Sequence, residues 1–402
     1  MQNVLPARRI NRLFALLEAA FYSAMFLIDG MIAQILSMMG YGDAYIGVLL
    51  SAMGISCVVM QPVLGYLCDK FRCYKAIFLT AYSLVAVSMP LFYAFAGNRT
   101  VATLYCVVTV ALVKSLFIVL DSWITKIEKQ GVQLDYGRLR SVGSVTYAFA
   151  AVLLAQILNR LGNAASVWLY WIIFAAMLVA LIKLPDPIET ADDARITLRE
   201  AAKSLLHNRS FTVFLVCGFL TWIGLQSQLL FNARLVSSLG GDVGDIGIAY
   251  FVMAFAEFFV ILSFTRIADK LGTEKTLALG MVGVALKGVA LWLCPTAGWA
   301  IAAQLLQAVS YALVIPGVVR YFGEQIPRSF LATAFVVYQT FSSGLAQIAF
   351  SPVYGSVSER LGVGAMLALT GLPSILGAVL LLLFVRAKRK KTAPEAPPDS
   401  AT

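Results

Sequence analysis

Long apolar segments separated by short polar turns run along almost the whole chain. A helix that crosses a membrane needs about 20 mostly apolar residues, and twelve segments meet this requirement. The pattern therefore predicts an all-α membrane protein with twelve transmembrane helices. The predicted spans cover residues 13–38, 44–68, 74–96, 100–125, 140–160, 164–184, 210–236, 246–267, 275–294, 298–321, 330–354 and 363–385.

The longest polar break divides these spans into six and six. We therefore predict an N-terminal six-helix half in residues 1–184, a cytoplasmic linker in 185–209 and a C-terminal six-helix half in 210–386. Residues 387–402 follow as a basic and then disordered cytoplasmic tail.

The composition excludes most soluble classes of protein. Of 402 residues, 60% are apolar and only 13% are charged, whereas soluble domains carry about 25% charged residues. The six cysteines form no CxxC pair and there is a single histidine, so no metal site or cofactor is expected. No GxxxxGK[ST], HExxH or GxSxG motif occurs, which argues against an enzyme and against ATP-driven transport by this chain alone.

The basic residues predict the orientation. Of the 31 Lys and Arg, four lie in predicted outer loops and two within spans, which leaves 25 on the inner side (outer: Arg99, Arg160, Arg234, Arg360; in spans: Lys114, Lys287). This asymmetry places both termini in the cytoplasm and accounts for the net charge of +10 without a nucleic-acid partner. We expect a multi-pass protein of the plasma (cell inner) membrane. Its expected partners are the lipid bilayer and a small-molecule solute, with no obligatory protein partner.

A short pattern of an acid or amide, a basic residue, an apolar residue and glycine recurs at four span ends. The copies begin at residues 69, 159, 269 and 359, so equivalent copies in the two halves are 200 residues apart and those within a half are 90 apart. Equal offsets indicate two duplicated halves, each made of two inverted three-helix units. Such bundles bind their solute near mid-membrane between the halves.

This layout resembles the major facilitator superfamily. The family's signature after span 2 is Gly-x-x-x-Asp-(Arg/Lys)-x-Gly, and the chain approaches it twice, with departures at Arg72 and Thr265. The resemblance implies a gate at the cytoplasmic ends of the halves, formed by Gly65, Asp69, Lys70, Asp269, Lys270 and Gly272.

Ionisable residues inside the spans are functional candidates, because each costs about 2.5–3.5 kcal/mol at mid-bilayer even on insertion scales. Span 1 carries Glu18, Tyr22, Met25 and Asp29 on one helical face. Glu18 lies near the predicted cytoplasmic end, so we interpret it as an interfacial group. Lone glutamines such as Gln307 are interpreted as interhelical hydrogen-bonding groups.

The end of span 4 and the start of span 5 narrow the resemblance. Asp121-Ser122-Trp123-Ile124 and the run Gly137-Arg138-Leu139-Arg140 are similar to the lactose-permease-like branch of oligosaccharide and nucleoside proton symporters. The resemblance implies that Asp121 and Arg140 form a charge pair that contacts sugar hydroxyls. It further implies a small residue near the substrate at Ser144, a stacking aromatic at Tyr147, the branch's span 8 acid at Glu257 and its span 9 basic group at Lys287.

The proton-coupling site is where the chain departs from the lactose permease. That protein has a His and a Glu in span 10 before a proline, whereas residues 311–315 before Pro316 include neither an acid nor a His. Coupling would then use Glu257 with Lys287, or Asp29. Asp29 could instead hold a cationic group of the solute or a sodium ion. Asn232 in span 7 is a further solute-binding candidate.

The favoured function is therefore secondary active transport of a small polar solute, a sugar or nucleoside, in symport with H+. Proton-coupled efflux of a drug or cation is the alternative, although span 5 lacks the Gly-Pro-Gly pattern of such antiporters. A membrane sensor that transports nothing is the remaining alternative.

Overall fold

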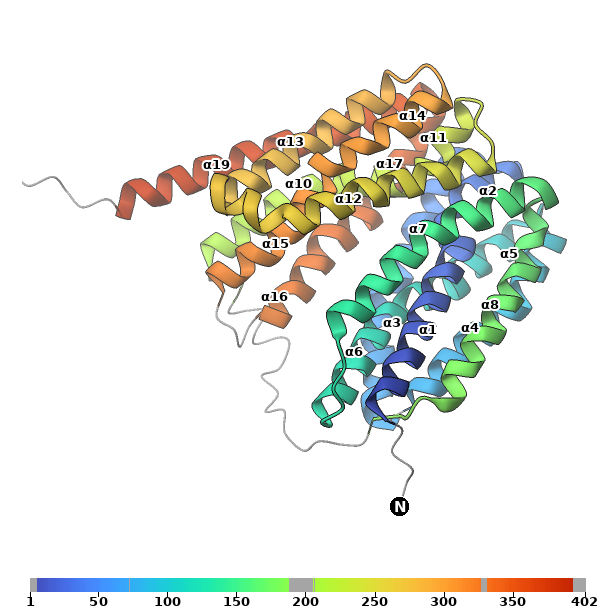
Figure 1. Ribbon diagram of the computed structural model, residues 1–402. Coiled ribbons are helices and arrows are strands. Elements are labelled where there is room, and N and C mark those ends of the chain that lie inside the picture. Colours follow the sequence, from blue (N-terminus) through green and yellow to red (C-terminus); the bar gives the residue numbers. More distant parts are fainter. Residues whose placement is uncertain (1–5, 72, 188–204, 206, 327–330, 393–402) are drawn as a thin grey trace, which may run out of the picture.

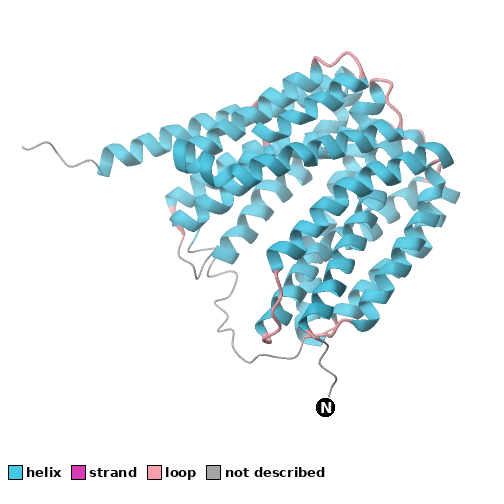
Figure 2. Cartoon of the chain, viewed as in Figure 1, coloured by secondary structure: helices cyan, strands magenta, loops and turns pink. Residues whose placement is uncertain are grey.

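The computed structural model describes residues 6–71, 73–187, 205, 207–326 and 331–392. Regular structure in these ranges is entirely helical (Figure 2). Within them, eleven helical stretches are long and apolar enough to cross a membrane, which confirms eleven of the twelve predicted spans. The predicted span at 330–354 is helical over residues 331–361, but its glutamines and serines make it more polar than the other eleven.

The first half runs from Ala7 to Lys183. It consists of α1 (Ala7–Met25), η1 (Phe26–Gly30), α2 (Ile32–Met38), α3 (Asp43–Phe71), α4 (Tyr74–Ala94), α5 (Arg99–Leu104), η2 (Tyr105–Val110), α6 (Ala111–Lys129), α7 (Tyr136–Leu161), η3 (Asn163–Ala165) and α8 (Ser166–Lys183).

The second half begins at Arg209. It consists of α10 (Arg209–Leu230), α11 (Asn232–Ser238), α12 (Val243–Leu271), α13 (Thr273–Trp292), α14 (Ala297–Ala303), η4 (Gln304–Val309), α15 (Tyr311–Gln325), α16 (Leu331–Tyr338), η6 (Gln339–Gly344), α17 (Leu345–Leu361), α18 (Val363–Gly371) and α19 (Pro373–Thr392). The predicted linker and tail lie largely outside the described residues.

The glycine of the internal repeat has a structural explanation. Gly162, Gly272 and Gly362 directly follow α7, α12 and α17, with φ of +83°, +87° and +86°. A side chain disfavours this left-handed conformation, so glycine is the residue that ends a helix and redirects the chain here. The repeat therefore marks equivalent helix ends. The fourth copy has Arg72 at this position, which lies outside the described residues.

Four spans change their helical winding at mid-length. Segments η1, η2 and η6 are π-helical turns in spans 1, 4 and 11, and η4 is a 3₁₀ turn in span 10. Such turns rotate the residues that follow them relative to a regular α-helix, and π turns occur frequently at functional sites. Asp29 lies inside η1, and Gln304 and Gln307 lie inside η4.

The two halves touch along α3 with α17 and along α7 with α12 (Figure 1). Glycines allow the backbones to meet. A Cβ atom at Gly47 would overlap the carbonyl oxygen of Ser351, and one at Gly247 would overlap that of Ala151. Because these glycines lie in the parts of α3 and α12 remote from the chain termini, the halves are packed backbone to backbone at that end.

Polar contacts fasten the same end. Arg234 Nε lies 2.9 Å from Asp43 Oδ1, and the Ser358 hydroxyl donates to Asp43 Oδ2 at 2.6 Å. The Tyr250 hydroxyl donates to the Gly30 carbonyl at 2.7 Å. Each of these bonds joins one half to the other. Toward the opposite end, where α1 begins, the ribbons of the halves diverge (Figure 1).

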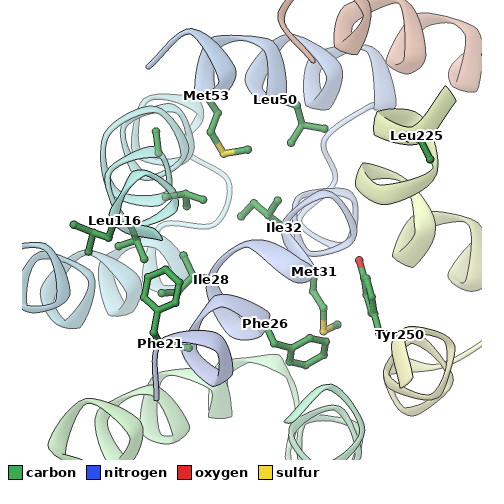
Figure 3. Packing of buried hydrophobic residues seen from close by; sticks show 14 of the residues in the cluster. Phe21, Phe26, Ile28, Met31, Ile32, Leu50, Met53, Leu116, Leu225 and Tyr250 are labelled. Atoms are coloured by element: carbon green, nitrogen blue, oxygen red, sulfur yellow. The ribbon is translucent and has the colours of Figure 1, made fainter. Parts of the chain in front are cut away.

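The apolar core continues across the boundary between the halves. Figure 3 shows Phe26 and Met31 of the first half beside Tyr250 of α12. The rings of Phe26 and Tyr250 meet edge to face with centroids 6.0 Å apart. Phe26 and Met31 are at most 1% exposed and Tyr250 is 4% exposed. This packing therefore closes the space between the halves on the side of the Asp43–Arg234 contact, which we call the fastened end.

Replacing Gly247 by Val should push α7 and α12 apart at the fastened end. Overpacking a tight contact costs about 1–3 kcal/mol, which is enough to shift a two-state equilibrium about fivefold or more. We expect the opposite end to close as a result. Alkylation of a cysteine placed at Ser144, an exposed position of α7, should therefore slow at least fivefold in a background without the native cysteines.

Gly323→Val is the matched control for this measurement, because a Cβ atom at Gly323 meets nothing within 4 Å. It should leave the alkylation rate unchanged. Equal rates in Gly247→Val and the unmodified background would contradict the assignment of this contact as the closed end.

Candidate functional site

A polar cluster in the first half is built around Arg140 of α7. Its guanidinium donates a hydrogen bond to the Tyr22 hydroxyl and lies over the Tyr22 ring, with Cζ 4.9 Å from the ring centroid. Asp121 of α6 and Glu18 of α1 both interact electrostatically with Arg140. The structure thus brings Asp121 and Arg140 together, and it adds Tyr22 and Glu18 from span 1.

Gly143 allows α1 and α7 to approach closely at this cluster. A Cβ atom there would lie 2.5 Å from Tyr22 Cδ2 and 2.8 Å from Glu18 Oε2. Because glycine has no side chain, α1 can place a tyrosine and a carboxylate directly against the backbone of α7. This contact places the Tyr22 and Glu18 side chains beside the turn of α7 that follows Arg140.

The other two predicted residues of α7 lie in different surroundings. Tyr147 packs edge to face on Phe26 and on Tyr250, with centroids 6.2 Å and 6.1 Å apart. It therefore belongs to the aromatic contact between the halves. Ser144 is exposed. It lies on the same side of α7 as Ala148 and Ala151, and those two alanines are buried where α7 packs on α12.

Asp29 forms an ion pair with Lys114 of α6. Lys114 Nζ lies 2.9 Å from Asp29 Oδ2 and 3.1 Å from Oδ1, and the two side chains are 21% and 20% exposed. The π turn η1 carries Asp29 and span 4 carries the lysine. The sequence placed both residues inside spans but did not indicate that they pair.

The second half holds a chain of three polar groups. Lys287 Nζ donates to Gln307 Oε1 at 2.5 Å, and Gln307 Nε2 donates to Glu257 Oε1 at 2.8 Å. Lys287 is 1% exposed and Glu257 is partly exposed. The structure therefore brings the predicted acid and base together through a glutamine that sequence analysis had interpreted as an interhelical hydrogen-bonding group.

Tyr311 lies between the two clusters. This residue of α15 interacts electrostatically with Glu257 in its own half and with Arg140 and Tyr22 in the other half. Its ring also packs edge to face on Trp222, with centroids 6.4 Å apart. The cluster around Arg140 and the cluster around Glu257 therefore face a common region between the halves. This position agrees with the solute site expected there.

Asn232 lies apart from both clusters. Its Oδ1 accepts a hydrogen bond from Gln304 Nε2 at 2.7 Å, and it is only 1% exposed. Its Nδ2 and Gln304 Oε1 have no hydrogen-bond partner within the described part of the chain. In this conformation Asn232 therefore joins spans 7 and 10 and is closed off from the surface.

The predicted gate residues lie at the end where the halves diverge. Asp269 Oδ1 pairs with Arg320 Nη2 of α15 at 2.8 Å, and Arg320 Nε also pairs with Glu324 at 2.8 Å. These pairs stay within the second half. Lys270 is exposed at the end of α12, ahead of the helix-ending Gly272.

In the first half, the equivalent Lys70 lies over the rings of Tyr66 and Phe71, 5.4 Å and 5.2 Å from their centroids. Gly65 lies within α3, in open surroundings. The side chain of Asp69 is outside the described part, so its contacts are not assigned.

Glu18, expected near the cytoplasmic end of span 1, is enclosed by the protein and is 1% exposed. Helix α1 begins at Ala7, six residues before the predicted span, so Glu18 lies well inside that helix.

Sequence reasoning also missed the roles of Tyr22 and Gln307 as hydrogen-bond partners of the two basic groups. Their helical faces were visible in the sequence, whereas the meeting of those faces was not. Within the described residues, no group of three or more His, Cys, Asp or Glu is arranged to hold a metal ion.

Comparison with known proteins agrees with this architecture. The family model of the Major Facilitator Superfamily matches residues 14–344 and, in a second match, 214–401. The chain is 25% identical to the maltose permease of Geobacillus stearothermophilus, covering 93% of this chain and 95% of that one. It is 24% identical to the sucrose permease of Escherichia coli over 70% of this chain and 69% of that one.

Solved structures are similar in fold at lower identity. The nucleoside transporter NupG superposes with a TM-score of 0.79 at 14% identity, covering 95% of this chain and 100% of that one. A D-xylose-proton symporter superposes with a TM-score of 0.67 at 14% identity, covering 92% and 96%.

The Asp29–Lys114 pair predicts a characteristic pattern of stability. Asp29→Asn or Lys114→Met alone leaves an uncompensated charge in the first half, which costs about 3–5 kcal/mol when the pair is fully buried and less at this exposure. Either variant should lower the melting temperature of the purified protein. The double variant Asp29→Asn/Lys114→Met should recover most of the loss, because no charge remains unpaired. A double variant as unstable as the worse single variant would contradict the pairing.

Proposed function

This chain belongs to the major facilitator superfamily, and from that premise we propose that it is a secondary active transporter of a small polar solute, a sugar or a nucleoside, in symport with protons. The observation that carries the proposal is the pair of clusters around Arg140 and around Glu257, which face each other near Tyr311. Placing charged groups inside spans costs free energy. Two charged clusters that face the same region therefore indicate a function.

The chemistry of the clusters suits a solute rich in hydroxyl groups. A guanidinium donates several hydrogen bonds in fixed geometry and a carboxylate accepts several, so Arg140 with Asp121 can hold neighbouring hydroxyls. Ser144 offers a further small polar contact one turn along α7. The similarity to maltose and sucrose permeases, and in fold to a nucleoside transporter, supports the same solute classes.

The arrangement of the halves supports alternating access. Contacts between them are concentrated at the end remote from the termini, and transporters of this layout work by rocking one half against the other around a central site. With cytoplasmic termini, as the distribution of Lys and Arg favours, this conformation is inward-facing. The protein would then reside in the plasma (cell inner) membrane.

Glu257 is our candidate for proton coupling. It is partly exposed and is joined by hydrogen bonds to Lys287 through the neutral amide of Gln307. A proton on Glu257 would therefore be exchanged without breaking a direct ion pair. Asp29, the other candidate, has its charge matched by Lys114. The lysine ammonium occupies the position that a cationic drug or sodium ion would need there, which disfavours cation antiport.

The first measurement is pH recording in lightly buffered cells that overproduce the protein, with pulses of maltose, sucrose, xylose, uridine and a cationic dye. Alkalinisation of the medium with one sugar or nucleoside is expected. Release of protons on addition of the dye, with no response to any sugar or nucleoside, would contradict symport and indicate antiport.

Arg140→Lys should weaken binding of the solute identified in this way at least tenfold, because an ammonium cannot reproduce the bidentate geometry of a guanidinium. Asp121→Asn should weaken it similarly by removing the acceptor charge. Binding to the purified protein would be measured by calorimetry. Arg138→Lys, the same substitution on an exposed side chain two residues away, is the control and should bind as the unmodified protein does. Undiminished affinity in both site variants would contradict the proposed solute site.

Glu257→Gln should separate exchange from accumulation. The amide keeps a polar group beside Gln307 but cannot carry a proton, so solute exchange should persist while pH-driven accumulation falls to a ratio of about 1. Glu128→Gln, at an exposed acid near the end of α6, should accumulate solute normally. Unchanged accumulation in Glu257→Gln would assign coupling to another acid.

A further inference from the structure

The membrane-facing surface of the second half carries an apolar groove that the proposed transport mechanism does not use. It lies between the neighbouring helices α10 and α19 (Figure 1) and has a volume of about 330 Å³. Its lining residues are Thr212, Val213, Val216, Leu380, Leu383 and Phe384. Five of these six are apolar, and the hydroxyl of Thr212 donates to the Asn208 carbonyl at 3.3 Å. The groove therefore suits hydrocarbon rather than a polar ligand.

The two helices pass each other in opposite directions along the groove. A Cβ atom at Gly377 would lie 3.0 Å from the Cys217 carbonyl oxygen, whereas further along α19 residues 380–384 face residues 212–216. Rising numbers on α19 thus meet falling numbers on α10. The turn that follows residue 384 consequently lies beside the first turn of α10.

Each helix places an arginine at that end of the groove. Arg209 precedes Thr212 by three residues and Arg386 follows Leu383 by three residues, so each arginine lies on the helical face that lines the groove. Both side chains are exposed. Each arginine also directly adjoins a predicted span, which puts the two guanidinium groups at the level of the lipid headgroups.

The surroundings of the two arginines are positively charged. Neither α10 nor α19 contains an acidic residue, and the sequence of α19 adds Lys388, Arg389, Lys390 and Lys391 after Arg386. Helix α13 also packs on α19. It carries Glu274 in its first turn, next to Lys275, and these two charges cancel. An apolar groove that ends at two arginines without a local acid is complementary to a molecule with a hydrocarbon chain and an anionic head.

We propose that this groove binds an anionic phospholipid, with one acyl chain between α10 and α19 and the phosphate held by Arg209 and Arg386. A guanidinium binds phosphate oxygens in bidentate geometry. The distribution of Lys and Arg places this end of the bundle on the cytoplasmic side, where anionic lipids attract basic groups near the membrane surface. The site requires no transported solute, so it is independent of the proposed function.

The proposed site lies entirely within the second half. A lipid bound there moves with α10 and α19 and does not bridge the two halves. Gly247→Val, which should change the arrangement of the halves, is therefore expected to leave the affinity for the lipid unchanged. A clear change in affinity would contradict a site contained in one half.

Native mass spectrometry of the full-length protein in detergent tests the headgroup contact. Phosphatidylglycerol should bind more tightly than phosphatidylcholine with the same acyl chains, by about fivefold for each arginine. The double variant Arg209→Gln/Arg386→Gln should remove this preference. Arg8→Gln/Arg138→Gln loses the same charge at exposed residues of the first half and should keep it. Equal binding of both lipids, or an equal loss in the two double variants, would overturn the proposal.

Filling the groove tests the acyl-chain contact without a change of charge. Val216→Trp places a large ring at a lining position that is 48% exposed, and it should weaken phosphatidylglycerol binding at least severalfold. Leu262→Trp, at a position of α12 that is 75% exposed, is the matched control and should bind as the unmodified protein does. Unchanged binding in Val216→Trp would overturn the assignment of the groove.

A competition measurement separates a lipid from a free phosphate ester. Glycerol 3-phosphate carries an anionic phosphate but no acyl chain, so an excess of it should leave phosphatidylglycerol bound. Displacement of the lipid by glycerol 3-phosphate would overturn the lipid assignment, because the arginines alone would then account for binding.

Discussion

An ionised side chain inside an apolar helical bundle must find a compensating partner, and the polar architecture of this protein follows from that constraint. Taking a charge out of water costs several kcal/mol even after the surroundings relax. Three of the charged groups within the spans have a defined neighbour: Asp29 has Lys114, Arg140 has Tyr22 with Asp121, and Lys287 has Gln307. These partners come from different spans, so compensation also determines which helical faces meet.

Contact between the helices of the two halves depends on glycines rather than on charged residues. Gly47, Gly247 and Gly355 contribute no side chain, and each lies where a Cβ atom would overlap a carbonyl oxygen of the other half. Backbone contact of this kind is made or lost as a whole, because no flexible side chain can bridge a partial separation. The Asp43–Arg234 pair reinforces the same end. A rigid contact at one end, with diverging helices at the other, is the arrangement that the proposed rocking of the two halves requires.

Much of the fold was predictable from the sequence, because hydropathy and charge distribution are averages over many residues. Eleven spans followed from such averages, and the duplicated halves followed from the equal spacing of a short motif. The pairings inside the bundle did not follow. Asp29 and Lys114 lie 85 residues apart, and periodicity assigns each to a helical face without showing which faces meet. The first turn of α1 was missed because Arg8, Arg9 and Arg12 interrupt the apolar pattern there. Tyr22 and Gln307 were missed as partners because neutral residues carry no signal of the charge that they solvate.

The two halves compensate their charges differently, and the difference bears on function. Asp29 and Lys114 touch directly, so each charge is stabilised by the other. Glu257 and Lys287 are separated by Gln307, whose carbonyl faces the lysine and whose amide group faces the acid. Lysine can only donate and a carboxylate can only accept, so the glutamine has a single orientation while both groups are ionised. Protonating Glu257 removes that restriction and weakens the whole chain of bonds. A proton on Glu257 would therefore alter a bridged pair without breaking a direct ion pair, and this supports our proposal that coupling takes place in the second half.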